Sequence, residues 1–420
     1  MRAMKDSGIE WIGLIPEGWK VNRIKHHFSV VSGATPRSEI SDYWDGDIPW
    51  ITPADYKTQD KYVEKGRRSL SKAGYDSCGT VLVPEGSIIF SKRAPVGTVA
   101  IAKNDLCTNQ GCLACVVKDE SDATFFYYAM SIFTEQFDLV STGTTFKEIA
   151  ADVFANFFLP TPDVSEQKRI AAFLDFECSR IDAVMEQTRA SIEEYKKLKQ
   201  AVITQAVTKG IRPNRPMKDS GIEWIGNIPD DWRVIKHKYA MHKEKSICEH
   251  YNNESIISLT MNGVIIRDLN AGGKMPITFD GYQYVYPEDL LLCLFDIDVT
   301  PRCVGIVKNH GVTSPAYSRF IVHKGYYNAY YDYLLRSIDD TKVFVHLAKN
   351  LRSSLTETDF GVLPTIAPPL DEQYEIANYL DKTIIGINGL ITKKEKLLSE
   401  LESYKKSLIY EYVTGKKEVH

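Results

Sequence analysis

Hydrogen-bond donors and cations recur at loop positions in two separate stretches of the chain. Arginine pairs with guanine edges and asparagine or glutamine pairs with adenine, while serine, threonine and lysine bind phosphates. These residue types can therefore support recognition of DNA. The candidate contact residues are Thr35, Arg37, Lys92, Arg93, Thr108, Asn109, Gln110, Thr144, Thr145, Lys147, Arg302, Ser314, Tyr317, Arg319, Arg352 and Ser353.

Motifs for catalysis are missing from the sequence. No GxxxxGK[ST] loop for a nucleotide-driven motor is present, no GxGxxG follows a predicted strand, and no HExxH occurs. The Asn/Asp-Pro-Pro-aromatic motif expected of an amino-methyltransferase is also missing, since Ala367 precedes Pro368-Pro369. We therefore predict no catalytic residue and no resident cofactor. An enzyme with an unfamiliar active site stays open as an alternative.

The eight cysteines are sparsely spaced in a long chain, a pattern that favours free thiols. Cys112 and Cys115 form a CxxC pair with Cys107 upstream. However, GCLACVV reads as an apolar strand, and neither a second CxxC nor a histidine pair completes four zinc ligands. We predict buried structural cysteines and no metal site.

Bulk properties limit the class of protein. The chain has 420 residues, enough for two to four domains, and a formal net charge of −4. Without a global basic field, DNA binding has to rest on local patches. Uninterrupted apolar runs such as Leu290 to Phe295 are too short to span a bilayer, and the start of the sequence lacks the apolar core of a signal peptide. The expected location is the cytoplasm.

Two long helices are predicted to position the loops. Glu166 to Lys209 and Glu372 to Gly415 overlay without a gap, with Glu166-Gln167 falling on Glu372-Gln373 at a constant shift of 206 residues. About 35–40 helical residues give a rod of roughly 50–60 Å. The gapless repeat indicates duplication and mutual packing. The alternative is a pair of unrelated surface helices, each packed on its own domain.

An apolar stripe with a period of 3.5 residues runs along both helices, as in a coiled coil. Counting three and then four residues from Ile181 and from Ile387 gives the predicted contact positions, and Met185, Ile192, Ile391 and Leu398 widen the stripe. The residues predicted to pack between the helices, or against a subunit, are Ile181, Val184, Ile192, Tyr195, Leu198, Ile387, Leu390, Leu397, Leu401 and Tyr404.

A second repeat precedes each half. Residues 4–21 read MKDSGIEWIGLIPEGWKV and residues 217–234 read MKDSGIEWIGNIPDDWRV, at a shift of 213. The tryptophans and prolines of this box indicate packing and a turn, with ligand binding as the alternative. Each half is therefore a box, a variable middle of strands and short helices, and a long helix. The segments Ala123–Leu139 and Gly325–Ile338 read as helices within the two middles.

The whole pattern resembles the DNA specificity subunit of type I restriction-modification systems. The twin boxes carry this resemblance, together with the twin Leu-Pro…Glu-Gln…Leu-Asp helix entries and the Val-Thr-Lys-Gly and Val-Thr-Gly-Lys helix ends. SGATPRSEISDYWDGDIPWITPADY, SKRAPVGTVAI, CTNQG and GTTFKEI look like one type of target-recognition domain in that family. The match covers essentially the whole chain, and the second middle is less familiar.

The resemblance implies an α+β (mixed) fold, in which two α/β target-recognition domains are separated by two long antiparallel coiled-coil helices in a pseudo-two-fold internal repeat. The expected division is 1–158 for the first target-recognition domain, 159–210 for the first helix, 211–362 for the second target-recognition domain and 363–420 for the second helix. Each domain would read one half of a bipartite, asymmetric site in double-stranded DNA. The helices would set the spacing of the half-sites.

Partners are implied by the same resemblance. Two modification (methyltransferase) subunits would methylate an adenine in each half-site with S-adenosylmethionine, and restriction (motor-nuclease) subunits would use ATP and magnesium. This chain would hold none of these cofactors. The alternatives are the specificity portion of another bipartite-site restriction or modification enzyme, and a coiled-coil scaffold that binds no DNA. The scaffold accounts for the helices but not for two donor-rich middles.

Overall fold

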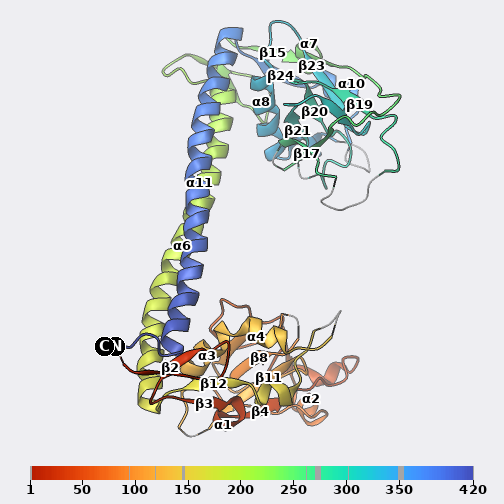
Figure 1. Cartoon of the computed structure of the whole chain (residues 1–420). Coiled ribbons are helices and arrows are strands. Elements are labelled where there is room, and N and C mark those ends of the chain that lie inside the picture. Colours follow the sequence, from red (N-terminus) through yellow and green to blue (C-terminus); the bar gives the residue numbers. More distant parts are fainter. Residues whose placement is uncertain are drawn as a thin grey trace. The chain divides into compact units, whose positions relative to one another are not determined.

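The computed structural model describes residues 2–93, 95–118, 120–143, 147–261, 263–269, 276–300, 302–348 and 354–419. The chain divides into two compact units (Figure 1). Unit 1 comprises Met1–Thr188 with Lys396–His420, and unit 2 comprises Arg189–Glu395. The boundaries of the two units differ from those of the four predicted parts, because each long helix contributes residues to both units. The predicted domain boundaries stay a prediction.

Unit 1 contains two main sheets with short helices around them. The larger sheet has the order β4-β11-β8-β9-β6, formed by Phe28–Ser32, Cys112–Val117, Ile88–Ser91, Val99–Ala102 and Tyr62–Val63. The smaller has the order β10-β5-β7, formed by Cys107–Thr108, Trp44–Ile51 and Arg68–Leu70. Two-stranded pairs join β1 (Met4–Asp6) to β2 (Leu14–Pro16) and β3 (Lys20–Arg23) to β12 (Phe158–Thr161). The helical segments are α1 Ile24–His27, η1 Ser41–Tyr43, α2 Lys72–Asp76, α3 Ala123–Ile132, α4 Thr134–Leu139 and α5 Ala151–Ala155.

Unit 2 repeats most of this strand order although its sequence differs. One sheet has the order β16-β23-β20-β21, formed by Met241–Lys243, Ser318–Val322, Leu290–Leu292 and Val304–Ile306. The other has the order β18-β17-β22-β19, formed by Gly263–Ile266, Ile256–Thr260, Gly311–Thr313 and Gln283–Val285. Pairs join β13 (Met217–Asp219) to β14 (Asn227–Pro229) and β15 (Arg233–Lys236) to β24 (Pro364–Ala367). The helices are α7 His237–Ala240, α8 Asn328–Asp340, α9 Val343–Leu347 and α10 Glu357–Val362. The internal repeat therefore extends to the middles.

Each unit is built on its own core. In unit 1, Phe90 and Leu113 of the larger sheet pack with Phe125 of α3. In unit 2, Leu292 of β20 packs with Tyr330 and Leu334 of α8. Cys112 and Cys115 are buried on β11, so the predicted strand is confirmed. In the described part of the chain, no group of three or more His, Cys, Asp and Glu side chains is arranged to hold a metal ion.

The long helices are α6 (Val164–Lys209) and α11 (Leu370–Val413), and they run antiparallel. In unit 1, the Asp182 carboxylate of α6 lies 2.6 Å from Lys405 Nζ of α11. In unit 2, Lys199 Nζ donates to Asn388 Oδ1 at 3.1 Å. The predicted α+β fold with two long paired helices is thus confirmed. Among the described residues, no helix combines the length and apolarity that a membrane crossing requires.

The helix contact stripe differs from the predicted one at alternate positions. From Ile181 and Ile387 the inward positions follow steps of four and then three residues, so Met185 and Ile391 are buried. Of the ten predicted packing residues, Ile181, Ile192 and Ile387 are buried, and Tyr195 and Leu401 are half-buried. The prediction that they pack between the helices is wrong for the five exposed residues, which are Val184, Leu198, Leu390, Leu397 and Tyr404.

The physical reason for this error is that apolar residues often occupy both candidate positions. Val184 stands beside Met185, Leu390 beside Ile391, and Leu397 beside Leu398. Neighbouring helical residues differ by about 100° in direction, so only one of each pair can face the partner helix. The sequence pattern alone does not decide between them.

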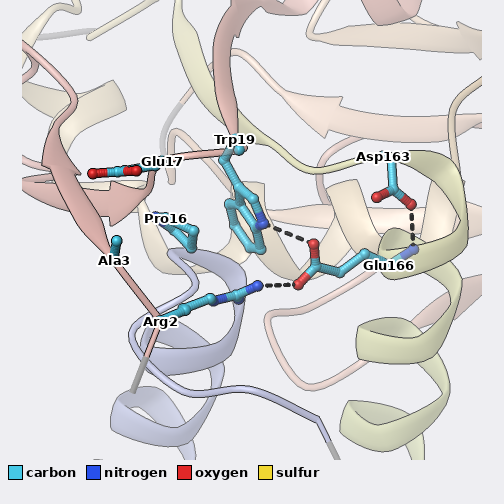
Figure 2. A pocket seen from close by; sticks show the side chains of 8 residues that line it. Arg2, Ala3, Pro16, Glu17, Trp19, Asp163 and Glu166 are labelled. Carbon is cyan, nitrogen blue, oxygen red and sulfur yellow. Dashed lines mark hydrogen bonds and ion pairs between the residues drawn. The ribbon is translucent and has the colours of Figure 1, made fainter.

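Three side chains at the start of α6 hold the rest of unit 1 to the helix. Glu166 accepts hydrogen bonds from Trp19 Nε1 at 2.8 Å and from Arg2 at 2.5 Å (Figure 2). The Gln167 Oε1 accepts from the backbone N–H of Asp122, the N-cap of α3. The Asp175 carboxylate accepts from the Tyr128 hydroxyl at 2.7 Å. We call Glu166, Gln167 and Asp175 the helix anchor of unit 1.

The helix anchor of unit 2 consists of Glu372, Gln373 and Asp381 at the same shift of 206 residues. Glu372 accepts from Trp232 Nε1 at 2.9 Å and pairs with Arg215. Gln373 Oε1 accepts from the backbone N–H of Tyr327, the N-cap of α8, at 2.8 Å. Asp381 accepts from the Tyr333 hydroxyl at 2.6 Å. Both units are therefore assembled by the same hydrogen bonds. The predicted packing role of the box tryptophans matches these contacts.

Glu166 and Glu372 differ in exposure, so we expect their substitution by alanine to lower the free energy of unfolding by different amounts. Glu372 has a fully buried side chain, whereas that of Glu166 is 13% exposed and lines a pocket of about 270 Å³. We expect Glu372→Ala to lower the free energy of unfolding by about 2 kcal/mol, since the buried Trp232 indole N–H loses its acceptor and Arg215 keeps only Asp231 as a partner. Glu166→Ala should cost less because water reaches Arg2. Urea unfolding of both variants measures this, and an equal or larger loss for Glu166→Ala would contradict it.

Buried histidines predict loss of stability in acid. Burial lowers the pKa of His237 to about 3 and that of His27 to about 4. Because the unfolded imidazole has a pKa near 6.5, the unfolded chain binds more protons as pH falls below about 6.5, and stability falls with it. His237 corresponds to the buried Ile24 of the first repeat. In urea unfolding between pH 6.5 and 4, we expect His237→Ile to reduce the slope of stability against pH, by up to about 1.4 kcal/mol per pH unit. The exposed His346→Gln should leave it unchanged, and a slope unaltered by His237→Ile would refute the assignment.

Candidate nucleic-acid interface

The predicted contact loops of unit 1 converge on one edge of its larger sheet. Pairing of Ser32 with Leu113 and of Ser91 with Cys112 places the ends of β4 and β8 beside the start of β11. The loops that follow β4 and β8 and the loop that precedes β11 therefore leave the sheet together. We call residues 33–37, 92–93, 108–111 and 147–148 the loop edge of unit 1.

Hydrogen bonds fix these loops against one another. The Thr35 hydroxyl donates to Gln110 Oε1, and the Ala34 N–H donates to the carbonyl of Thr108 at 3.0 Å. The Lys92 carbonyl accepts from the N–H of Ile149 at 3.0 Å. Gly33 permits the close approach, because a Cβ there would lie 2.2 Å from the Thr108 carbonyl oxygen. The loop edge is thus a connected structure.

One carboxylate balances two cations at this edge. Glu148 lies 2.9 Å from Lys92 Nζ and 2.8 Å from Arg93 Nε. The hydrogen bond from Lys92, followed by that from Arg93, lowers the pKa of Glu148. Lys147 pairs with Asp138 at 2.5 Å. The glutamate was missed from the sequence, although it follows directly after the predicted contact Lys147.

The remaining predicted contacts in unit 1 differ in accessibility. Thr35, Arg37 and Gln110 are exposed, and Asn109 is half-buried with its Oδ1 accepting from the Gly111 N–H. Thr108 is a correction, because its side chain is 2% exposed and cannot reach a ligand. Thr144 and Thr145 lie outside the described residues.

Unit 2 builds the same edge from different residues. Leu292 at the end of β20 pairs with Ser318 at the start of β23. The Leu355 N–H donates to the Leu294 carbonyl at 2.8 Å, as Ile149 does to Lys92, and Leu355 lies 206 residues after Ile149. Parallel pairing of Ile257 with Thr313 repeats that of Ile51 with Thr108. We call residues 259–261, 293–302 and 314–318, within the described part of the chain, the loop edge of unit 2.

Two predicted arginine contacts of unit 2 are corrected by their pairing. Arg319 is 4% exposed, and its Nε donates to Asp289 at 2.5 Å. The Arg302 side chain is 13% exposed and donates to Asp340 at 2.7 Å. Their partners lie about 30 to 40 residues away in the chain, so the sequence pattern gave no sign of them. Both arginines are structural cations and no longer candidates for direct DNA contact.

The other predicted contacts of unit 2 lie in the loop before β23. Ser314 and Tyr317 are half-buried, and Gln283 Nε2 donates to both of their carbonyls, at 3.2 and 2.7 Å. Arg352 and Ser353 lie outside the described residues. Apolar side chains at this edge, including Met261, Phe295 and Val299, were missed. Only their apolar character within a predicted loop region could have pointed to them.

Comparisons with known proteins agree with this arrangement. A family model described as the type I restriction modification DNA specificity domain matches residues 16–194. The specificity subunit of the type I restriction enzyme MjaIX of Methanocaldococcus jannaschii is 38% identical over 168 residues, which are 39% of this chain and 39% of that protein. The MjaVIII specificity subunit of the same organism is 24% identical, over 96% of this chain and 93% of that one.

Solved structures share the fold at low identity. A chain from a structural study of type I restriction-modification complex assembly has a TM-score of 0.74 at 13% identity, covering 96% of this chain and 99% of that one. The HsdS subunit of Thermoanaerobacter tengcongensis has a TM-score of 0.52 at 13% identity, covering 96% and 98%. Residues 16–194 thus match the type I restriction modification DNA specificity domain, and the whole chain is similar to specificity subunits of type I restriction enzymes in sequence and in fold.

Proposed function

We propose that this chain is the sequence-reading subunit of a type I restriction-modification complex, and that each unit reads one half of a bipartite, asymmetric DNA site. One observation carries the proposal: the same loop edge is built twice on the same strand order, with different side chains. Unit 1 presents Arg93, Asn109 and Gln110, whereas unit 2 presents Ser314 and Tyr317. Two loop edges that share a strand order but carry different side chains are suited to recognising two different half-sites.

The proposed partners are two modification subunits and the restriction subunits. S-adenosylmethionine would bind to the former, and ATP and magnesium would be used by the latter, while this chain remains non-catalytic and cytoplasmic. The relatives support an assembly, since they are named as specificity subunits of restriction enzymes. Exposed apolar side chains on the paired helices, such as Val184 and Leu397, would provide surface for a docking subunit to cover.

Methylome sequencing tests the proposal. A host that expresses this chain with its modification subunits should acquire one bipartite motif with a methylated adenine in each half. Gln110→Ala changes an exposed side chain of the unit 1 edge and should alter or relax one half only. Ser314→Ala should alter the other half only. A motif without two halves, or a single variant that changes both, would contradict the proposal.

Charge at the unit 1 edge predicts the salt dependence of binding. Glu148→Gln should release Lys92 and Arg93 for phosphate, tighten DNA binding by the complex, and make the slope of log affinity against log salt more negative by about 0.9 for one additional phosphate contact. The matched control is Glu64→Gln, which removes the exposed partner of Lys103 at the opposite edge of the same sheet. Equal effects of both substitutions would remove the support for this edge as the DNA contact.

A further inference from the structure

A pocket of about 260 Å³ opens at the loop edge of unit 2. It lies where β17 ends, where the segment after β20 runs, and where β23 begins. The lining residues are Leu259, Thr260, Met261, Cys293, Phe295, Val299, Thr300, Arg302 and Tyr317. Apolar side chains at its rim face water, because Met261 is 58%, Phe295 38% and Val299 74% exposed. Exposed apolar side chains grouped around a pocket indicate a binding surface.

Three polar side chains of the pocket wall, those of Thr260, Thr300 and Arg302, are engaged within the protein. Thr260 Oγ1 donates to the Gly263 carbonyl at 2.9 Å, and Thr300 Oγ1 donates to the Asp296 carbonyl at 2.7 Å. Arg302 is paired with Asp340, and the negative charge of Asp340 weakens the attraction of Arg302 for an anion. The pocket is therefore better suited to an apolar group than to a phosphate.

The corresponding position in unit 1 has the opposite chemistry. The carbonyls of Lys92 and Leu294 accept from Ile149 and Leu355, which fixes the equivalence of the two segments. The next residue is Arg93 in unit 1 and Phe295 in unit 2. An ionic contact point at one edge is thus replaced by an aromatic ring at the other. This difference indicates that unit 2 contacts a base through its apolar surface.

We propose that the pocket between Met261, Phe295 and Val299 receives the C5-methyl group of a thymine in the half-site read by unit 2. That methyl is the apolar group that base pairs display in the major groove, and it distinguishes thymine from the other bases. The inference rests on the proposed function and adds a specificity determinant to it. A thymine in that half-site is then read by its methyl group.

Replacing thymine by deoxyuridine removes only this methyl group. Once the motif is known, each thymine of the site is replaced in turn by deoxyuridine, and binding by the complex with its modification subunits is measured. We expect one substitution in the unit 2 half-site to weaken binding about fourfold, as loss of one buried methyl group predicts. Equal affinity at every substituted position would overturn the inference while the proposed function stands. Failure to bind any bipartite site would overturn both.

A variant with a matched control separates this contact from a structural effect. Met261→Gln keeps the length of the side chain but makes the pocket wall polar, so the ratio of affinities for thymine and deoxyuridine DNA should fall from about four toward one. Ile277→Gln changes a fully exposed residue of the same unit outside the pocket lining and should keep the ratio. A ratio of about four retained in Met261→Gln would overturn the assignment of the pocket.

Discussion

A carboxylate at the start of each long helix is the contact on which both units depend. Glu166 and Glu372 each receive an indole N–H from the box and a guanidinium from a residue just before it. The Glu372 side chain is fully buried and that of Glu166 is 13% exposed, so each carboxylate has to be satisfied mainly by protein donors or its burial is costly. The box, the helix start and the variable middle are thereby held together by one site. Repeated scaffolding and differing loops are compatible because none of the proposed reading residues takes part in this site.

The second general feature is that topology is retained where sequence is not. The strand orders β4-β11-β8-β9 and β16-β23-β20-β21 correspond, and each is accompanied by a parallel pair, β5–β10 or β17–β22. Antiparallel registers then bring the same set of loops to the same edge in both units. Loop residues can change without disturbing the sheet, since the core side chains lie within the strands and the loops leave at the strand ends. Under the proposed function, a half-site preference can therefore change in one unit alone.

Sequence reasoning succeeded where a repeat or a period carried the information. The gapless shift of 206 residues located both long helices, and the donor-rich segments marked loops that converge in unit 1. It failed where the outcome depends on which partner a residue meets. Arg319 and Arg302 look like DNA contacts until Asp289 and Asp340 are found beside them. Val184 and Met185 are equally apolar, and only the position of the partner helix distinguishes them. Glu148 and the pocket at Phe295 likewise arise from tertiary contacts that no local pattern encodes.

The pairing of cations with carboxylates also affects how a DNA-reading protein discriminates between DNA sequences. Lys92 and Arg93 share Glu148, and Arg302 and Arg319 are each held by aspartate. Phosphate contacts supply affinity that is independent of sequence, so a surface rich in free cations would bind every DNA and compress the difference between right and wrong sites. A chain with a net charge of −4 and partly neutralised loop edges avoids this. Under the proposed function, selectivity would then depend on hydrogen bonds and apolar contacts to base edges, and total affinity on the proposed partner subunits.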